Sequence, residues 1–507
     1  MSSFGSRKNA LNAMGNYTLK KVLIVPILLV TSCNFWQRKQ QLYPNRPLVK
    51  NKSIVFVKSN SPNPPDFKNV EKVKTIKGVT IWKIKLSTGE QIPKSLVLLT
   101  KRQTPFSYYD TMYATRLQKG YRSLEDLRTG YKTNVLNGVY LQALAKQFPK
   151  LVHYRVIGKT RQGRKIHAVK IGYTSQKNKV AYLFNGAHHG SELISTEHCY
   201  DMIYDLLKNK ANNQQIFANL DLWFVPLVNP DGTHNFWFQS VRMGRKNGLL
   251  HREVKDPLAQ GVDLNRNYPF HWHSKTPKAS SSEKSSAYYR GDRPASEPET
   301  QAMIRLAREN YFLSSISYHS LGTCILFPYT IDNLKNPKPD YVQTLSQKLT
   351  ASAISLRIKF RKYTSLKKIY SVDGTDQDYL YHEFGTNALL VESSHETPPY
   401  DLAKKVTKNF RPGWKRFLDE YFTGYRIEFQ LVDSKNRPVE WNVSIEGLQY
   451  YEKEIRKSQK KTGIFRQMVL EDKQYKVTIQ KGKVKKSFSI SPVKGAVQLK
   501  KISVSSI

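Results

Sequence analysis

The chain has 507 residues, of which 39% are hydrophobic, so its length predicts two to four domains with sizeable buried cores. Three cysteines are too few for a disulfide framework. The 82 Lys and Arg against 39 Asp and Glu give a net charge of +43, which favours anionic surroundings such as nucleic acid, anionic lipid or an acidic envelope polymer. The basic residues are spread through every segment without a helix-turn-helix, zinc-finger or RNA-recognition pattern, so no specific nucleic-acid partner is expected.

The N-terminal residues 1–33 have the pattern of a signal peptide. Lys20 and Lys21 precede the apolar run 22–30, which is too short for a membrane span, and small residues lead to Cys33. The ending Val-Thr-Ser-Cys resembles a bacterial lipobox, so the protein is predicted to be exported and anchored in a bacterial cell envelope by a lipid on Cys33. An ordinary signal peptide and an uncleaved anchor are the alternatives. Mass spectrometry that finds no lipid on Cys33 would contradict the prediction.

Residues 34–52 are polar and basic and are predicted to be a tether. The next segment contains the short alternating runs SIVFV, VTIWKIKL and SLVLL, separated by turn residues, which predict a small β-rich region. Residues 101–128 are aromatic and basic. Residues 53–128 are therefore assigned to this N-terminal region and its linker, with no function attached.

A strand, a turn and a helix are predicted where the sequence reads VAYLFNGAHHGSELISTE, residues 180–197. The apolar run ends at Asn185-Gly186, and a helical pattern continues to Leu207. His189 and Glu192 are three residues apart at the turn that enters the helix, where one metal ion can accept both side chains. The alternative is a polar turn with solvated histidines.

Strands alternate with helices from residue 129 to residue 422, which predicts one α/β domain with a mixed, largely buried sheet and helices on both faces. Helices are expected at 135–152, from Ser296 and over 400–422, and Ser296 with Glu299 forms a capping-box pattern. One long strand or two strands are expected around His319, and the last buried strand is TNALLVESS. Residues 423–507 show strand patterns without a helical period and predict a small β-sandwich.

His319 is the candidate third ligand, because it follows an alternating apolar strand and a catalytic zinc usually takes three protein ligands. His188 competes with His189, but the residue three positions after His188 is Ser191, a poor zinc ligand, so the spacing favours His189. Glu392 ends the last apolar strand and is the candidate general base, since burial beside an activated water suits proton transfer. A glutamate exposed just past the strand end is the alternative.

The segment VDLNRNYPF supplies candidates for substrate binding. Arg266 presents a planar fork that matches a carboxylate, and Asn265 adds a donor, so these residues with Asp263 could hold a free C-terminal carboxylate. The alternative is a turn with surface charge. The basic stretch 242–247 offers a cation that could face a developing oxyanion.

The chain carries a series of short motifs in a fixed order: HGSE, VNPDG, RKN, DLNRNYPF, YRGDRPASEPET, SYHS, IYSVDGTDQDY and LLVES. Each motif is weak alone, but the series over residues 131–422 resembles the zinc metallocarboxypeptidase superfamily, the carboxypeptidase A/B/E group. The resemblance implies one zinc ion per chain, held by His189, Glu192 and His319. It also implies that Glu392 is the general base and proton shuttle.

The resemblance extends to the substrate and to the groups around the metal. It implies that Asn265, Arg266 and Tyr370 hold the terminal carboxylate of the substrate. It implies that Asp263 orients the first histidine ligand through a hydrogen bond. It further implies that Arg245, from the Arg-Lys-Asn triplet, stabilises the oxyanion.

The sequence departs from the digestive members of the superfamily at several positions. Those members often have Arg before the motif glutamate, where this chain has Ser191, and Gly190 resembles the regulatory carboxypeptidase E/D/N branch. That branch carries a transthyretin-like β-sandwich after the catalytic domain, which agrees with residues 423–507. Gly244 stands where an aromatic residue commonly precedes the oxyanion arginine, so Arg242 remains a competitor of Arg245.

The position that faces the substrate side chain is ambiguous. Counting from Tyr370 places it near Gln377, and counting from His319 places it near Thr330. Neither is acidic, although a pocket specific for Lys or Arg normally has an acid. Asp373 and Asp376 lie close by in the sequence.

The sequence thus predicts a zinc-dependent carboxypeptidase that hydrolyses the C-terminal bond of peptides or proteins with a zinc-bound water and a Glu base. One alternative is a carboxypeptidase or amidase acting on peptidoglycan stem peptides, which suits an exported basic chain. A non-catalytic envelope-binding lipoprotein on a peptidase scaffold is the alternative from another class. A monomer is expected.

Overall fold

The computed structural model describes residues 53–60, 63–65, 70–76, 79–86, 97–99 and 121–504, except 177, 239–243, 251–259, 357–361 and 395–396. The chain forms two compact units, residues 1–108 and 109–507, and each is described by itself. The predicted signal peptide, lipobox and tether, and Arg242, lie outside the described residues. None of the helices in the described ranges has both the length and the apolar character that crossing a membrane requires.

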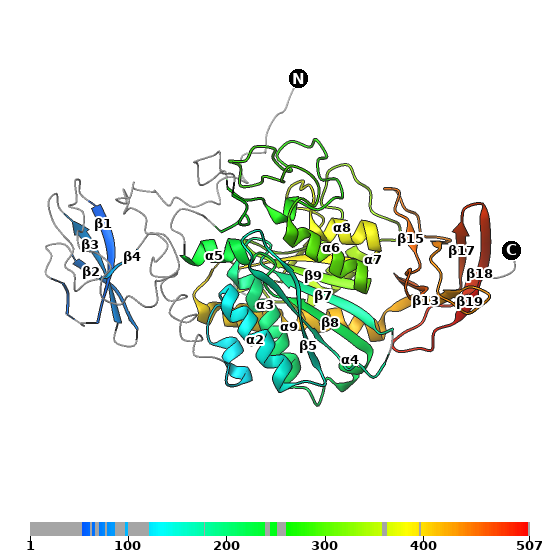
Figure 1. The fold of residues 1–507 in the computed structure, drawn as a ribbon, viewed down its shortest axis with the longest axis horizontal. Helices are drawn as coiled ribbons and strands as arrows, with labels where there is room; N and C mark the ends of the chain where they lie inside the picture. The colour runs from blue at the N-terminus through cyan, green and yellow to red at the C-terminus, as the bar shows by residue number, and fades with distance from the viewer. Residues whose placement is uncertain are drawn as a thin grey trace, which may run out of the picture. The chain divides into compact units, whose positions relative to one another are not determined.

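The first unit contains an antiparallel sheet with the strand order β2-β3-β1-β4 (Figure 1). Its strands are β1 Ser53–Ser59, β2 Val70–Ile76, β3 Val79–Leu86 and β4 Val97–Leu99. Strands β1, β3 and β4 correspond to the three alternating runs, whereas β2 was not expected. Its register shifts between Lys72 and Lys74, and such a bulge breaks the alternation by which a strand is recognised in sequence.

The second unit is built on an eight-stranded mixed sheet with the order β11-β10-β12-β9-β7-β8-β6-β5. Its strands are β5 Val152–Lys159, β6 Lys165–Ile171, β7 Val180–Gly186, β8 Leu220–Val225, β9 Ser314–His319, β10 Thr323–Leu326, β11 Thr364–Leu366 and β12 Asn387–Ser393. Every residue of β7 and of β9 is buried, as expected for strands covered on both faces. The predicted mixed, largely buried sheet is confirmed, and the segment around His319 forms two strands.

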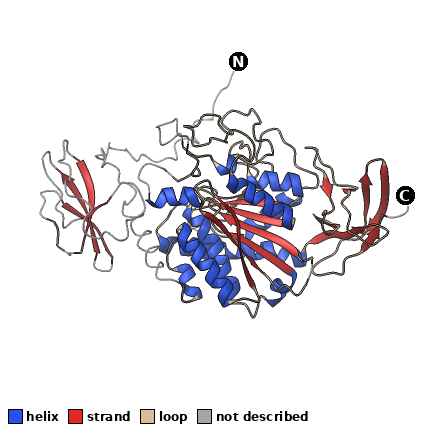
Figure 2. Ribbon diagram, viewed as in Figure 1, coloured by secondary structure: helices blue, strands red, loops and turns tan. Residues whose placement is uncertain are grey.

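Helices pack against both sides of this sheet (Figure 2). They are α2 Asn134–Gln147, α3 Leu193–Lys208, α4 Gln214–Asn219, α5 Pro230–Phe238, α6 Pro298–Asn310, α7 Tyr341–Ser352, α8 Asp376–Phe384 and α9 Tyr400–Thr423, with the 3-10 helices η1 Leu124–Arg128 and η3 Leu264–Arg266. Helix α3 contacts β7 and β9, and α8 contacts β9 and β12. The helices that follow β7 and precede β12 are therefore held against the strands in the centre of the sheet.

The start of α6 differs from the predicted capping box, which is wrong. The helix begins at Pro298 with Glu297 at the N-cap, and no side chain caps it. The Ser296 hydroxyl instead donates to the Glu297 carboxylate and accepts from Asn267. A proline at the first helical position has the required φ and lacks the N–H that a cap would satisfy, so Pro298 sets this boundary.

The order of the strands decides where functional side chains can gather. Strands β8, β7, β9 and β12 are neighbours and run parallel, so their carboxyl ends meet at one edge. The chain passes from β7 to β8 on one side and later returns to β9 on the other side of β7. A crevice opens at the carboxyl ends where the strand order reverses in this way. The turn after β7 and the end of β9 border that crevice.

The C-terminal strands form two sheets with the orders β16-β13-β19 and β15-β14-β17-β18. They are β13 Tyr425–Val432, β14 Asn442–Ile445, β15 Arg456–Lys457, β16 Ile464–Val469, β17 Tyr475–Lys481, β18 Val484–Ile490 and β19 Lys501–Ser503. Both sheets contribute side chains to one apolar core, which makes a small β-sandwich.

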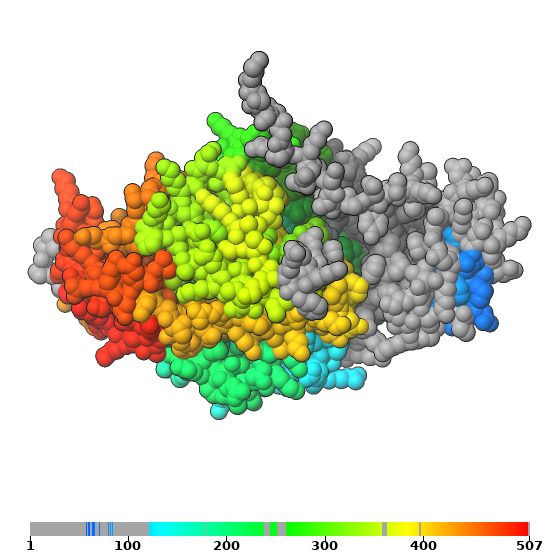
Figure 3. Space-filling view, turned by 180° about the vertical axis from the view of Figure 1, so that it is seen from behind, coloured from blue at the N-terminus to red at the C-terminus, as the bar shows by residue number. Residues whose placement is uncertain are grey.

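The β-sandwich lies directly against the central domain, as the orange and red segments of Figure 3 show. The Tyr329 hydroxyl donates to Glu454 over 2.8 Å, and the Arg456 guanidinium donates to the carbonyl of His382 in α8 over 2.9 Å. The sandwich therefore braces α8 and the segment that leads to Thr330.

Glu299, in the first turn of α6, is fully buried, and it forms no ion pair with any of the described residues. One carboxylate oxygen accepts from Asn247 over 3.3 Å, and the other has no partner. Burial, with the nearby charges of Glu297 and Asp231, raises the pKa of Glu299 to about 8. Glu299 is therefore protonated in the fold at neutral pH.

This raised pKa predicts a pH-dependent stability. Because the folded pKa lies above the unfolded value, the contribution is complete at low pH and is lost as pH rises from about 4.5 to about 8. Glu299→Gln keeps the neutral form at every pH. Its melting temperature minus that of the wild type should therefore increase by about 2 °C or more when the pH is raised from about 5 to about 8. The exposed control Glu283→Gln should not show this gain. Parallel curves for Glu299→Gln and the wild type would contradict the assignment.

Candidate active site

Three predicted ligands meet at the crevice between β7 and β9. His189 lies in the turn after β7, Glu192 precedes the first residue of α3, and His319 is the last residue of β9. His189 Nδ1 lies 2.7 Å from Glu192 Oε1 and 3.3 Å from His319 Nδ1, and His319 Nδ1 lies 3.1 Å from Glu192 Oε2. In the described part of the chain, these three form the one buried group of His, Cys, Asp or Glu able to hold a metal ion.

The donor set fits zinc. Bonds of about 2.0–2.2 Å in a tetrahedral site separate ligand atoms by roughly 3.3 Å, close to the separations seen here. Two imidazole nitrogens and a carboxylate are also ligands that zinc accepts readily. Glu192 is further fixed by the backbone N–H of Ser320, which donates to Oε2 over 3.1 Å.

Asp263 and Arg245 hold the His189 ring in place through a chain of hydrogen bonds. His189 Nε2 lies 3.1 Å from Asp263 Oδ1, which leaves Nδ1 free to face the other ligands. Arg245 donates to Asp263 Oδ2 from Nε over 3.0 Å and from a terminal nitrogen over 2.7 Å. Burial opposes the charge of Asp263, but the charges of Arg245 and His189 outweigh it and hold the pKa of this carboxyl well below its usual value.

The second histidine of the pair, His188, directs its Nε2 atom to Tyr268 and not to the other ligands. Its Nε2 lies 2.9 Å from the Tyr268 hydroxyl, and its ring stacks on His319 with a centroid separation of 5.6 Å. The structure thus brings His189, not His188, to Glu192 and His319, as the spacing predicted.

Glu392 stands beside His319, because the two residues are register partners on β12 and β9. Its Oε2 atom is buried without a hydrogen-bond partner. Burial, followed by the charge of Glu192, raises the pKa of Glu392 to about 8. A β-carbon at Gly322 would lie 2.3 Å from the Glu392 β-carbon, so only glycine lets the β9–β10 turn pass this close. The arrangement leaves a carboxyl group available for proton transfer.

The three predicted carboxylate-binding residues also come together. Asn265 and Arg266 lie in η3 and are buried, and Arg266 approaches the Tyr370 hydroxyl at 3.4 Å. Arg266 Nε is buried without a partner, while the Tyr370 side chain is 48% exposed. A buried guanidinium with an unused donor beside an exposed tyrosine is suited to an incoming carboxylate.

The predicted oxyanion arginine, Arg245, reaches the ligand group, with one terminal nitrogen 3.9 Å from Glu192 Oε1. Gly244 before it has φ of +75°, and a β-carbon there would lie 2.6 Å from Phe236. This explains glycine in place of an aromatic residue.

Tyr288 was not expected from the sequence. Its ring lies 5.2 Å from the Arg245 guanidinium carbon and 5.4 Å from that of Arg266, both within cation–π range. One aromatic ring thus contacts both arginines. The adjacent Tyr288-Tyr289 pair was the available signal, but a pair of tyrosines alone does not indicate cation contacts.

The candidates for the specificity position are both buried near the start of α8. The Thr330 backbone N–H and hydroxyl donate to Asp378 Oδ2 over 2.9 Å and 2.8 Å. Gln377 is 2% exposed, and its Oε1 atom has no partner. Thr330 is therefore committed to an internal bond, whereas Gln377 retains an unused acceptor.

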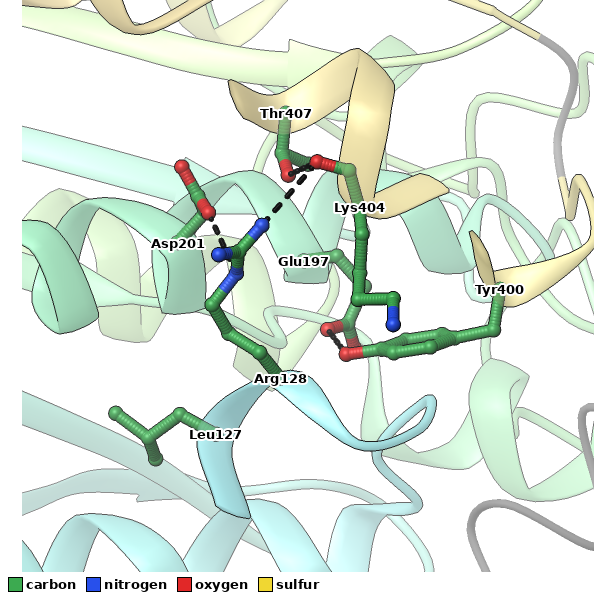
Figure 4. A pocket seen from close by; sticks show the side chains of 7 residues that line it. All are labelled: Leu127, Arg128, Glu197, Asp201, Tyr400, Lys404 and Thr407. Carbon is green, nitrogen blue, oxygen red and sulfur yellow. Dashed lines mark hydrogen bonds and ion pairs between the residues drawn. The ribbon is translucent and has the colours of Figure 1, made fainter. Parts of the chain in front are cut away.

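A separate pocket forms where η1, α3 and α9 meet (Figure 4). It contains none of the predicted site residues and is lined by Leu127, Arg128, Glu197, Asp201, Tyr400, Lys404 and Thr407. Arg128 pairs with Asp201 at 2.9 Å, and the Tyr400 hydroxyl donates to Glu197 over 3.0 Å. These contacts tie α3 to its neighbours and stabilise the helix that begins next to Glu192.

Comparison with known proteins agrees with the resemblance found in the sequence. A family model described as zinc carboxypeptidase matches residues 138–412. The metallocarboxypeptidase A of Trichophyton rubrum is 30% identical over 302 residues, which cover 57% of this chain and 68% of that protein. A protein of Ajellomyces capsulatus (strain H143) named inactive metallocarboxypeptidase ECM14 is 26% identical over 278 residues, covering 48% of this chain and 45% of that protein.

Two solved structures share the fold. The thrombin-activatable fibrinolysis inhibitor superimposes with a TM-score of 0.55 at 18% identity, covering 73% of this chain and 98% of that chain. The carboxypeptidase A from Helicoverpa armigera gives a TM-score of 0.54 at 19% identity, covering 72% and 96%. These likenesses concern the fold, a mixed α/β domain with a central mixed sheet.

The ligand group predicts a stabilising response to zinc. Zinc in about 100-fold excess over its dissociation constant should raise the melting temperature of the metal-free protein by about 5 °C or more, and a chelator should reverse the rise. His319→Ala removes one of three ligands and should abolish most of the response, whereas the control His273→Ala, on an exposed histidine, should retain it. An unchanged response in His319→Ala would show that zinc binds elsewhere.

Proposed function

This chain belongs to the zinc carboxypeptidase family, and from that premise we propose that it is an active metallocarboxypeptidase that removes the last residue of peptides or proteins. One relative is named inactive, so membership alone does not decide activity. The observation that carries the proposal is the convergence of His189, Glu192 and His319, with Glu392 beside His319 on the adjacent strand.

Zinc held by these ligands would supply Lewis acidity, which makes water more acidic and polarises the scissile carbonyl. Glu392 accepts the proton of the attacking water and then donates it to the leaving amine nitrogen. A cation near Glu392 favours its charged form, so the high pKa of this carboxyl falls when the site is loaded. Glu392 is then a base at neutral pH.

Two arginines bind two different negatively charged groups of the substrate. Arg245 lies near Glu192, where it offers donors to the oxygen of the scissile carbonyl as negative charge develops. Arg266, with Asn265 and Tyr370, binds the terminal carboxylate, so cleavage is restricted to the last peptide bond. Asp263 holds both the His189 ring and the Arg245 guanidinium in place.

The surroundings of the enzyme are proposed from sequence. We propose that the chain is exported and anchored through a lipid on Cys33, and that it acts as a monomer with one zinc ion. We also propose that the C-terminal sandwich is of the transthyretin-like kind found in the carboxypeptidase E/D/N branch. Two sheets around one core and a position directly after the catalytic domain support this last assignment.

Glu392→Gln tests the role of the base. The variant keeps the shape of the side chain but accepts no proton, so kcat should fall by about 10²–10⁴-fold while the zinc content stays unchanged. The matched control is Glu383→Gln, on an exposed glutamate of α8, which should cleave at the wild-type rate. Wild-type turnover by Glu392→Gln would refute the assignment.

Arg266→Ala tests recognition of the terminal carboxylate. The variant should lose about 100-fold in kcat/KM on peptides with a free C-terminus and much less on the same peptides amidated. The control Arg293→Ala, on an exposed arginine, should alter neither. Equal losses on both kinds of peptide would mean that no carboxylate is recognised by Arg266.

A further inference from the structure

The last part of the β-sandwich carries charges of one sign. From residue 473 to residue 507 the sequence contains nine lysines and no Asp, Glu or Arg. All nine lysines are exposed. Elsewhere in the described chain, several exposed lysines pair with an acid, as Lys208 does with Glu125 and Lys415 with Asp205. A segment with so many lysines and no acid is therefore distinctive even in this basic protein.

Most of these lysines gather where two edge strands meet. Strand β18 is at the edge of one sheet of the sandwich, and β19 is at the edge of the other (Figure 1). Lys486 in β18 donates to the carbonyl of Ser503 in β19 over 2.9 Å, so the two edges lie side by side. We use the term basic edge for the lysines on or directly next to these strands and the turn before β18: Lys481, Lys483, Lys485, Lys486, Lys500 and Lys501.

The basic edge continues onto a neighbouring loop, residues 433–437. Lys501 Nζ donates to Asn436 Oδ1 over 3.3 Å, which places this loop beside β19. The loop adds the exposed Lys435, and its acid, Asp433, is already paired with Arg437 at 2.8 Å. None of the lysines of the basic edge forms an ion pair with any described residue. The cations therefore spread in two directions, along β18 and across to β19 and the loop.

A cluster of cations without acids needs an explanation. Like charges repel within a Debye length of about 8 Å, which opposes their gathering on one face. Lysines on an edge strand prevent edge-to-edge pairing, and this accounts for Lys485 and Lys486. It does not account for Lys483 in the turn or Lys500 before β19. It also does not account for the absence of glutamates, which would reduce the repulsion. The cluster therefore indicates an anionic partner.

The chemistry of the basic edge favours a lipid surface. Lysine binds phosphate as a point charge, without the planar fork by which arginine recognises a particular geometry. The one aromatic residue of β18 and β19, Phe488, packs against the core of the sandwich, so these strands offer no platform for stacked bases. Point charges spread over a face match a planar layer of headgroups, whereas a single polymer chain would contact only one row.

We propose that the basic edge docks the β-sandwich onto a membrane surface that contains anionic phospholipids. The ammonium groups lie near the headgroup phosphates, and each lysine adds to the attraction. A single acyl chain gives only reversible membrane binding, and stable attachment takes a second signal such as a polybasic surface. The basic edge supplies that second signal together with the lipid proposed on Cys33. No residue of the candidate active site takes part, so this proposal does not rest on the peptidase activity.

The first experiment measures binding to lipid vesicles. It uses the full-length chain with Cys33→Ser, which cannot carry the lipid, and vesicles of phosphatidylcholine with or without about one third of phosphatidylglycerol. Binding to the anionic vesicles should be at least about 100-fold tighter than to the neutral ones in about 0.1 M salt, and most of it should be lost in about 0.5 M salt. Equal binding to both kinds of vesicle would overturn the proposal.

Two sets of variants in the same background locate the contact. Replacing four lysines of the basic edge by glutamine should weaken binding to anionic vesicles by at least about 100-fold. The set is K481Q, K483Q, K485Q and K500Q. The control removes the same charge from exposed lysines of the central domain and should stay within about threefold of the parent. It consists of K146Q, K150Q, K405Q and K408Q. Equal losses in both sets would show that overall charge, not the basic edge, is responsible.

Single substitutions make the result independent of how the fourfold variant folds. K483Q and K485Q should each weaken binding to anionic vesicles by about fivefold, and neither should change the cleavage of peptides. Poly-L-glutamate and duplex DNA serve as soluble polyanions. If the fourfold variant binds anionic vesicles as the parent does but loses affinity for either polymer, the basic edge binds a soluble polyanion and the membrane assignment is wrong. A protein that cleaves no peptide but shows the expected vesicle binding would refute the proposed activity and support this docking surface.

Discussion

Two imidazole nitrogens and one carboxylate face one another within 3.3 Å, and a cation between them would stabilise this arrangement. The fold of the domain holds the three side chains at these separations. The pairing of β7 with β9 brings His189 and His319 to the same edge of the sheet. Helix α3 begins at the same edge, so Glu192 joins them. Because both strands are buried along their whole length, the separations are set by the core of the domain.

Acidic side chains alternate with basic ones around this group. Asp263 lies between His189 and Arg245, and Glu192 lies between the two histidines. Oε2 of Glu392, beside His319 in the neighbouring strand, and Nε of Arg266 are buried without hydrogen-bond partners. Buried polar groups are normally satisfied, so these two atoms support the proposed roles of Glu392 in proton transfer and of Arg266 in substrate binding.

The sequence allowed the strands β7, β9 and β12 and the ligand pair to be predicted, because alternation and short spacing are local properties. The capping box at Ser296 failed because Pro298 determines the helix start. Two features could not be predicted: the contacts of Tyr288 with two arginines, and the lack of a hydrogen-bond partner for Asp376 Oδ1. Both depend on residues far away in the chain, and Asp376 differs from Asp373 only in which neighbours the fold supplies.

The central claim is that one zinc ion is held by two histidines and one glutamate. X-ray absorption spectroscopy of the zinc-reconstituted protein, combined with metal analysis, tests it most directly. The account predicts one zinc per chain, with two imidazole ligands and the remaining positions filled by oxygen at about 2.0–2.2 Å. Substoichiometric zinc, or a spectrum without imidazole scattering, would contradict it.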